Sequence, residues 1–208
     1  MVLTIVDWKK MLLSVSNLLK ENAEQLSQLD SVMGDGDHGI TINKIAGTIQ
    51  NDVEQWKDDT TLKDFLENLG WNIMGVNGGS AGPLWGNLFI GFSDGMNDEI
   101  EVDEILFKKM FIFGLDEIYE ITSARIGDKT MMDALIPAVQ SMKNSNSSIT
   151  KMLEDAYNAA KDGEENTINM IAKFGRAKNL KERSLGYKDP GAVSISLLFE
   201  GMAKGLYK

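Results

Sequence analysis

The chain has no cysteine, a single histidine, His38, and only three prolines among its 208 residues. Without cysteine, neither a disulfide framework nor a thiolate zinc site can form. With one histidine, catalytic arrangements that need two, and metal sites built from several, are excluded as well. Any chemistry must therefore come from carboxylates, hydroxyls, backbone groups and cationic side chains.

The sequence also lacks a long apolar run and an excess of basic residues. The longest apolar stretches, 84–92 and 105–115, are interrupted by glycine, asparagine or lysine well short of the roughly 20 residues of a membrane span. The first ten residues show no small-residue cleavage site, so we expect no secretory signal and a cytoplasmic protein. A formal net charge of −10 argues against a nucleic-acid surface, and any phosphate ligand would need bound cations.

What the chain does contain is apolar residues at helical spacing along nearly its whole length, as in Leu62, Phe65, Leu66 and Leu69. Alternating strand patterns are scarce, and no break in composition divides the chain, so we predict a single all-α domain, residues 1–208. The predicted helices, with boundary errors of about two to four residues, number eight: 5–28, 39–54, 61–76, 83–97, 102–124, 130–144, 149–174 and 190–207.

Short connections make successive helices antiparallel, so alternate loops should gather at the same end of an up-and-down bundle. The loops after the first, third, fifth and seventh predicted helices are chemically distinctive: Asp30 to His38, Asn77 to Gly82, Arg125 to Thr130, and Gly175 to Asp189. The other loops are plain polar connectors. We therefore predict a site at one pole of the bundle.

Three carboxylates, Asp30, Asp35 and Asp37, lie within eight residues on a glycine-rich segment. Their spacing matches neither an EF-hand nor a dinucleotide-binding loop, because the closing glutamate of the former and the preceding strand of the latter are missing. Oxygen ligands of this kind suit magnesium, which completes its shell with phosphates and water. An isolated Asp-Gly-Asp is often only a polar turn, but its companions at the predicted pole favour a metal site, and three aspartates suggest two ions.

Groups that could bind phosphate accompany these carboxylates at the same pole. The segment 77–82 ends at Pro83, which suits the first turn of a helix whose free N–H groups attract anions. His38 could donate to a phosphate or orient an aspartate, although a lone histidine is more often structural. Further cations that could neutralise a transferring phosphate, unless they are merely solvated, are Arg125, Lys129, Arg176 and Arg183.

Along essentially its whole length the chain resembles DhaL, the nucleotide-binding subunit family of dihydroxyacetone kinases. The resemblance rests on four ordered motifs: Asp30 with Gly34 to Gly39, Gly78 to Gly86, Gly127 to Met131, and Gly175 to Ala177 with Glu182 to Ser184 and Asp189 to Gly191. It implies an eight-helix antiparallel barrel with the nucleotide at one end, which agrees with the pole predicted above.

The resemblance also implies particular ligands and partners. Two Mg²⁺ ions would be held by Asp30, Asp35 and Asp37. The nucleotide, ADP or ATP, would be surrounded by His38, Gly39, Ile40, Thr41, Ser80, Ala81, Met131, Arg176, Asp189, Pro190 and Gly191. A phosphohistidine of a DhaM-type partner would recharge bound ADP, and the phosphoryl group would pass to dihydroxyacetone on a DhaK-type partner, so that no catalytic side chain beyond the Mg-nucleotide centre is expected on this chain.

The chain departs from the family pattern at Ile40 to Ile42, at Gly78 to Gly82, and most strongly at Ile121 to Ile126, where an Arg-Gly-Lys-Ala stretch is expected. The resemblance therefore does not predict which nucleotide or partner contacts this last stretch makes. The alternatives that stay open are an ATP-dependent kinase subunit for another short ketose, a nucleotide-binding regulatory module without phosphoryl transfer, and the DhaL-like part of a fatty-acid kinase.

Overall fold

The computed structural model describes residues 2–97 and 99–207, and this part of the chain is all-α, as predicted. It contains the α-helices α1 (Ile5–Glu21), α2 (Ala23–Met33), α3 (His38–Glu54), α4 (Leu62–Met74), α5 (Ala81–Asp94), α6 (Glu104–Ile121), α7 (Met132–Asn144), α8 (Ile149–Asn166) and α9 (Pro190–Leu206). Two 3₁₀ segments, η1 (Thr167–Asn169) and η2 (Arg176–Ser184), lie between α8 and α9. None of the described helices is both long and apolar enough to span a membrane.

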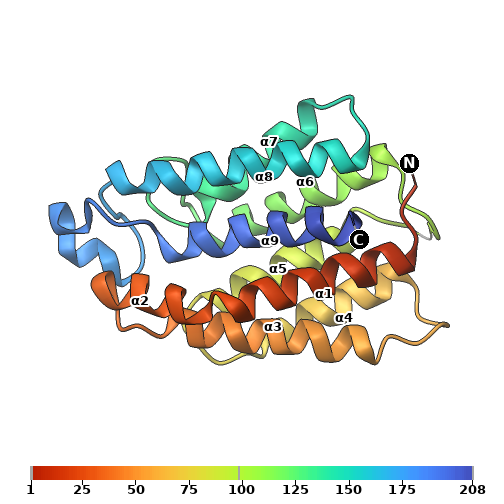
Figure 1. Ribbon diagram of the computed structural model, residues 1–208, viewed down its shortest axis with the longest axis horizontal. Coiled ribbons are helices and arrows are strands. Elements are labelled where there is room, and N and C mark those ends of the chain that lie inside the picture. The colour runs from red at the N-terminus through yellow and green to blue at the C-terminus, as the bar shows by residue number, and fades with distance from the viewer. Residues whose placement is uncertain (1, 98, 208) are drawn as a thin grey trace.

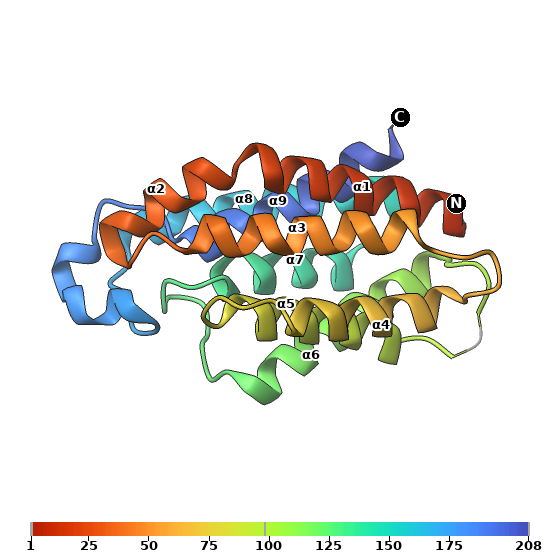
Figure 2. The same cartoon turned by 90° about the horizontal axis from the view of Figure 1, so that it is seen from below.

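The helices form a closed ring. Starting from α1, contacts run to α3 and then through α4, α5, α6, α7 and α8 to α9, which packs back on α1. Consecutive members of the ring run in opposite directions, and α2 extends α1 beyond a bend (Figure 1). The loops 34–37, 75–80, 122–131 and 167–189 therefore meet at one end, which we call the site end (Figure 2). The described loop residues 55–61, 95–97, 99–103 and 145–148 form the opposite end.

The ring is filled by apolar side chains. Phe111 lies at its centre, with ring centroids 4.5 Å from Phe92 and 5.6 Å from Phe199. Glycines allow adjacent helices to approach closely: a Cβ on Gly70 of α4 would lie 2.7 Å from the carbonyl oxygen of Gly86 in α5. This packing makes the ring a rigid support for the loops at its ends.

The first predicted helix, 5–28, is broken at Asn22. The Asn22 side-chain amide donates to the Leu18 carbonyl oxygen at 2.8 Å, and this bond competes with the helical pattern. The chain resumes as α2, which continues to Met33. The sequence had suggested that Asp30 lies in a loop. In the structure Asp30 lies in the last turns of helix α2.

The predicted helix 149–174 is also too long. Helix α8 ends at Asn166, where the Thr167 hydroxyl donates to the Glu164 carbonyl oxygen at 2.6 Å. After η1 the chain runs to Gly175, and the stretch predicted as a loop, 175–189, contains η2. Similarly, the helix predicted over 102–124 ends at Ile121 as α6. Both shortened ends lie at the site end and leave more chain free to shape it.

Candidate functional site

A cavity of about 660 Å³ opens at the site end between the four loops. All three candidate metal ligands, Asp30, Asp35 and Asp37, line it. Nine of the eleven residues predicted to surround a nucleotide line it too: His38, Thr41, Ser80, Ala81, Met131, Arg176, Asp189, Pro190 and Gly191. The fold thus brings residues that are up to 161 positions apart in the sequence, from Asp30 to Gly191, into one cavity.

Gly39 and Ile40, the other two predicted nucleotide residues, are not among the residues that line the cavity. A Cβ on Gly39 would lie 1.9 Å from the Ala23 carbonyl oxygen, so this glycine lets α3 pack closely on α2. The Ile40 side chain is 57% exposed on the outer face of α3. In this structure Gly39 acts through packing, and Ile40 points away from the hollow.

The three carboxylates come together because the chain turns sharply between α2 and α3. Asp30 is on α2, Asp35 is in the loop, and Asp37 is the N-cap residue of α3. Gly36 adopts a φ of +77°, a conformation that residues other than glycine rarely adopt. The backbone N–H of His38 donates to Asp30 Oδ2 at 3.3 Å and fixes the far side of the turn.

The carboxylate cluster fits a hard divalent cation. One carboxylate oxygen from each of Asp30, Asp35 and Asp37 lies within 4.8 Å of the others. Three negative charges at this spacing repel one another unless cations lie between or beside them. Arg176 supplies one such cation through an ion pair with Asp35. The all-oxygen ligand set is the one Mg²⁺ prefers, and it leaves coordination positions for phosphate oxygens and water.

The loop before α5 brings the N-terminus of a helix to the cavity. Gly78 and Gly79 have φ values of +150° and +55°, and Ser80 is the N-cap residue without a side-chain capping bond. The first N–H groups of a helix have no partner within it. A Cβ on Gly78 would lie 1.9 Å from Thr41 Oγ1, so only glycine lets this loop rest against α3.

His38 joins α3 to α9 at the cavity wall. Its Nε2 lies 3.4 Å from Ser194 Oγ, and the Ser194 hydroxyl donates to the Gly191 carbonyl oxygen at 2.8 Å. Burial lowers the pKa of His38, against the opposing effects of Asp30 and of the Pro190 backbone. The imidazole is therefore mainly neutral at pH 7 and acts here as a hydrogen-bonding link rather than as a fixed positive charge.

Lys129, predicted as a phosphate-neutralising cation, is instead used to hold the chain together. Its side chain is 98% buried, and its Nζ donates to three carbonyl oxygens, those of Thr167, Ser184 and Tyr187, at 2.8, 2.7 and 2.5 Å. All three ammonium hydrogens therefore have acceptors. Burial lowers the pKa of Lys129, while Asp189 and Asp133 oppose this shift. The residue fastens the 167–189 segment to the 122–131 loop.

Two aspartates at helix starts complete this framework. Asp133, in the first turn of α7, accepts from the N–H groups of Gly127 at 2.6 Å and Thr130 at 2.7 Å. Asp189 caps α9 by accepting from the Ala192 N–H at 2.8 Å. Burial raises the pKa of Asp189 to about 7, and the nearby Asp133 adds to this effect. Asp133 was not identified from the sequence as a residue that shapes the site. The pattern that could have indicated it is an acidic residue in the first turn of a predicted helix.

The remaining wall of the cavity is apolar. It includes Leu84, Trp85, Ile121, Met132 and Phe174. The divergent stretch 121–126 contributes Ile121, Thr122 and Ala124 to this wall. Arg125 faces elsewhere, since its guanidinium stacks 4.2 Å from the Tyr119 ring centroid and donates to the Ala124 carbonyl oxygen. This wall suits the flat face of an aromatic base.

Comparison with known proteins agrees with this arrangement. A family model described as "DAK2 domain" matches residues 32–204. The chain is 32% identical to the ADP-binding subunit DhaL of the PEP-dependent dihydroxyacetone kinase of Escherichia coli K12, over 96% of this chain and 94% of that one. It is 33% identical to the DhaL subunit of kinase 1 of Listeria innocua, over 88% of each chain.

Among solved structures, the chain is similar to the dihydroxyacetone kinase of C. freundii in complex with AMP-PNP and Mg²⁺. The TM-score is 0.74 at 27% identity, and the match covers 94% of this chain but 33% of that longer one. The matched family, the subunit-length relatives and the shared all-α fold confirm the resemblance first noted in the sequence motifs. The chain is a member of the DAK2 domain family.

Proposed function

We propose that this chain is the ADP-binding subunit of a cytoplasmic dihydroxyacetone kinase. In this proposal it keeps a nucleotide in the site-end cavity, receives phosphoryl groups from a DhaM-type phosphohistidine protein and delivers them to dihydroxyacetone bound by a DhaK-type subunit. The observation that carries the proposal is the meeting of three carboxylates, a helix N-terminus, Arg176 and an apolar wall around one cavity. Together they provide for the metal, phosphate and base of a nucleotide.

Each group of residues has a distinct task in this proposal. Asp30, Asp35 and Asp37 would hold two Mg²⁺ ions, which when bound neutralise phosphate oxygens during transfer. Arg176, which pairs with Asp35 at the cavity, would turn to the phosphates. The N–H groups at the start of α5 would donate to phosphate oxygens. The apolar side chains of the far wall would cover the base and exclude water.

The chain holds no second histidine that could carry a phosphoryl group, and its site-end cavity is taken up by the proposed nucleotide. Both observations favour a division of labour in which the sugar is bound elsewhere. We therefore expect no kinase activity from this chain alone. A nucleotide held by metal bridges and several loops at once should also leave slowly, which suits a bound cofactor that is recharged in place.

The proposal is tested by following the nucleotide and the product together. The purified chain should release ADP or ATP on denaturation, as seen by mass spectrometry, and lose it on chelation of Mg²⁺. With a DhaK-type subunit and a phosphohistidine donor, product should form while labelled bound nucleotide stays in place. Fast turnover on free ATP with fast exchange of label would instead favour the ATP-dependent ketose kinase. Tight nucleotide binding without any transfer would favour the regulatory module.

A further inference from the structure

Positive charge in this acidic chain is concentrated in one segment. Residues 170–188 contain six lysines or arginines and a single acidic residue, Glu182, which gives a local net charge of +5. Since the whole chain carries −10, the remainder carries −15. The segment lies at the site end, where it forms the rim of the cavity through Phe174, Gly175, Arg176 and Ala177. The charge is therefore placed beside the mouth of the site.

Half of these cations have partners within the protein. Lys173 pairs with Asp128 at 2.7 Å, Arg176 pairs with Asp35, and Lys188 pairs with the buried Glu164 at 2.8 Å. The other three are Lys178, Lys181 and Arg183, which we call the basic tip. Their side chains are exposed and form no hydrogen bond or ion pair with the described part of the chain. Partners within the protein thus account for the first three cations and not for the basic tip.

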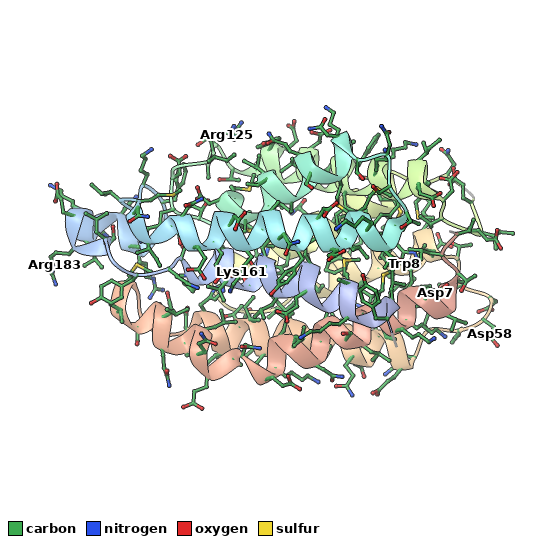
Figure 3. The ribbon with its side chains drawn as sticks, turned by 45° about the horizontal axis from the view of Figure 1, so that its top comes forward. Asp7, Trp8, Asp58, Arg125, Lys161 and Arg183 are labelled. Atoms are coloured by element: carbon green, nitrogen blue, oxygen red, sulfur yellow. The ribbon has the colours of Figure 1, made fainter. Side chains whose placement is uncertain are left out.

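The basic tip is presented on a fixed support. Segment η2 projects beyond the helices at the site end in both ribbon views, and Arg183 marks its outer edge (Figures 1, 2 and 3). Lys129 holds the carbonyl oxygens of Ser184 and Tyr187, and the Ser184 hydroxyl in turn donates to the Lys181 carbonyl oxygen at 2.6 Å. These bonds reduce the entropy that a partner would otherwise have to remove on binding.

Apolar side chains flank the tip. Leu185 is 40% exposed and Tyr187 is 43% exposed, both on the stretch that follows η2. A cationic edge beside exposed aromatic and aliphatic side chains is a composition common in protein interfaces, where charge guides the approach and apolar contacts add affinity. Nucleic acid is a poor alternative partner, because the rest of the chain is strongly negative.

We propose that the basic tip is a docking surface for an acidic face of the DhaK-type subunit that carries the phosphoryl acceptor. The inference rests on the proposed function, which requires that subunit to reach a cavity whose rim is the same segment. The acceptor subunit must come to this rim whether the nucleotide is recharged by a phosphohistidine protein or replaced by free ATP. A donor protein must do so in only one of these schemes, so the acceptor subunit is the occupant that both share.

The test compares two triple charge reversals in the full chain. The tip variant is Lys178→Glu, Lys181→Glu and Arg183→Glu, and a second tip variant carries Gln at the same positions. The control variant is Lys10→Glu, Lys57→Glu and Lys143→Glu, which changes exposed lysines near the opposite end by the same total charge. Association with the DhaK-type subunit, and separately with the phosphohistidine donor, of the same organism is measured by stopped flow across ionic strengths. Mg-ADP binding is measured for every variant.

At low salt the Glu tip variant should associate about tenfold or more slowly than the unaltered chain, and the Gln variant should lie between them. The control variant should stay within about twofold, and Mg-ADP affinity should be unchanged throughout. Equal slowing of tip and control variants, or no slowing of either, would overturn the inference. So would slowing confined to a phosphohistidine donor. A chain that binds no Mg-ADP even when unaltered would contradict the proposed function instead, and association would still report on the tip.

Discussion

The two ends of the helical ring differ in the backbone conformations of their loops. Every described residue with a positive φ lies at the site end: Gly36, Gly78, Gly79, Gly127, Lys129, Gly175, Lys181 and Gly186. At the opposite end the described loop residues use ordinary backbone conformations and local contacts, such as the stacking of Trp56 on Phe65 with centroids 3.7 Å apart. Figure 3 shows Arg183 and Asp58 at these two ends.

This difference shows where the chain adopts backbone conformations that cost free energy. A positive φ costs little for glycine but of the order of 1 kcal/mol or more for a lysine, and it persists where surrounding bonds hold it in place. At the site end these turns point backbone groups and carboxylates into the cavity. The opposite end only has to reverse the chain. Matched substitutions at the two ends should therefore have unequal effects.

The largest contrast is expected for a carboxylate. Asp37→Asn removes a negative charge from the three-aspartate cluster without changing the size of the side chain, so Mg-dependent ADP affinity should fall by about 100-fold or more. Asp58→Asn, the same change at the opposite end, should leave affinity unaltered. Isothermal titration with ADP at fixed Mg²⁺ measures both, after circular dichroism has shown that the variants are folded. Equal affinity in the two variants would exclude Asp37 as a metal ligand.

The next contrast concerns two lysines whose ammonium groups bind backbone carbonyl oxygens, the buried Lys129 and the half-buried Lys108. Lys129→Met leaves three carbonyl oxygens without their donor, so the free energy of unfolding should fall by about 3 kcal/mol. Lys108, at the opposite end, donates to the single carbonyl oxygen of Ser145, and Lys108→Met should cost less than about 1 kcal/mol. Urea titration gives both values, and hydrogen exchange should become faster across 167–187 only in Lys129→Met. Unchanged exchange there would show that Lys129 does not secure this segment.

The last contrast depends on pH. The pKa of Asp189 is about 7 in the folded chain, against 3.8 for an unperturbed aspartate, so the folded state binds this proton more tightly than the unfolded state. Asp189 should therefore favour folding less and less as pH rises from about 4 to about 7. Asp189→Asn should flatten that decline while keeping an N-cap. Asp103→Asn, at an N-cap of the opposite end, controls for loss of a capping carboxylate. The measurement is the free energy of unfolding of nucleotide-free protein between pH 4 and 8. If this free energy changed with pH by the same slope in the two variants, the expectation would be refuted.

The ring of helices could be predicted because it follows from local periodicity and loop length. Pro190 and Pro83 were correctly placed in first turns, as α9 begins at Pro190 and Pro83 is the third residue of α5. The break at Asn22 was missed because a side-chain amide can either face solvent or bond to the preceding turn, and both fit the same apolar spacing. The sequence also suggested, correctly, that distinctive loops share one end.

The detailed roles at that end were less accessible. The family resemblance placed Arg176 at the nucleotide, and Arg176 lines the cavity. The sequence could not show that the ammonium group of Lys129, a residue that also lines the cavity, binds three backbone carbonyl oxygens. Backbone carbonyls carry no sequence signature, so a lysine that binds three of them reads as a free cation. Trp85 could not be recognised as a cavity residue from the sequence, since a cavity wall and a core require the same apolar side chains.

Because α9 packs on α1, the first and last described residues lie at the same end of the molecule, away from the cavity (Figures 1 and 2). The ring has therefore no topological need to start at α1. A circular permutant that joins the termini with a short flexible linker and opens the chain in the 55–61 loop would keep all four site-end loops uncut. Immobilisation through either terminus would likewise leave the cavity and the basic tip facing solution, which makes the protein convenient for surface-based kinetics.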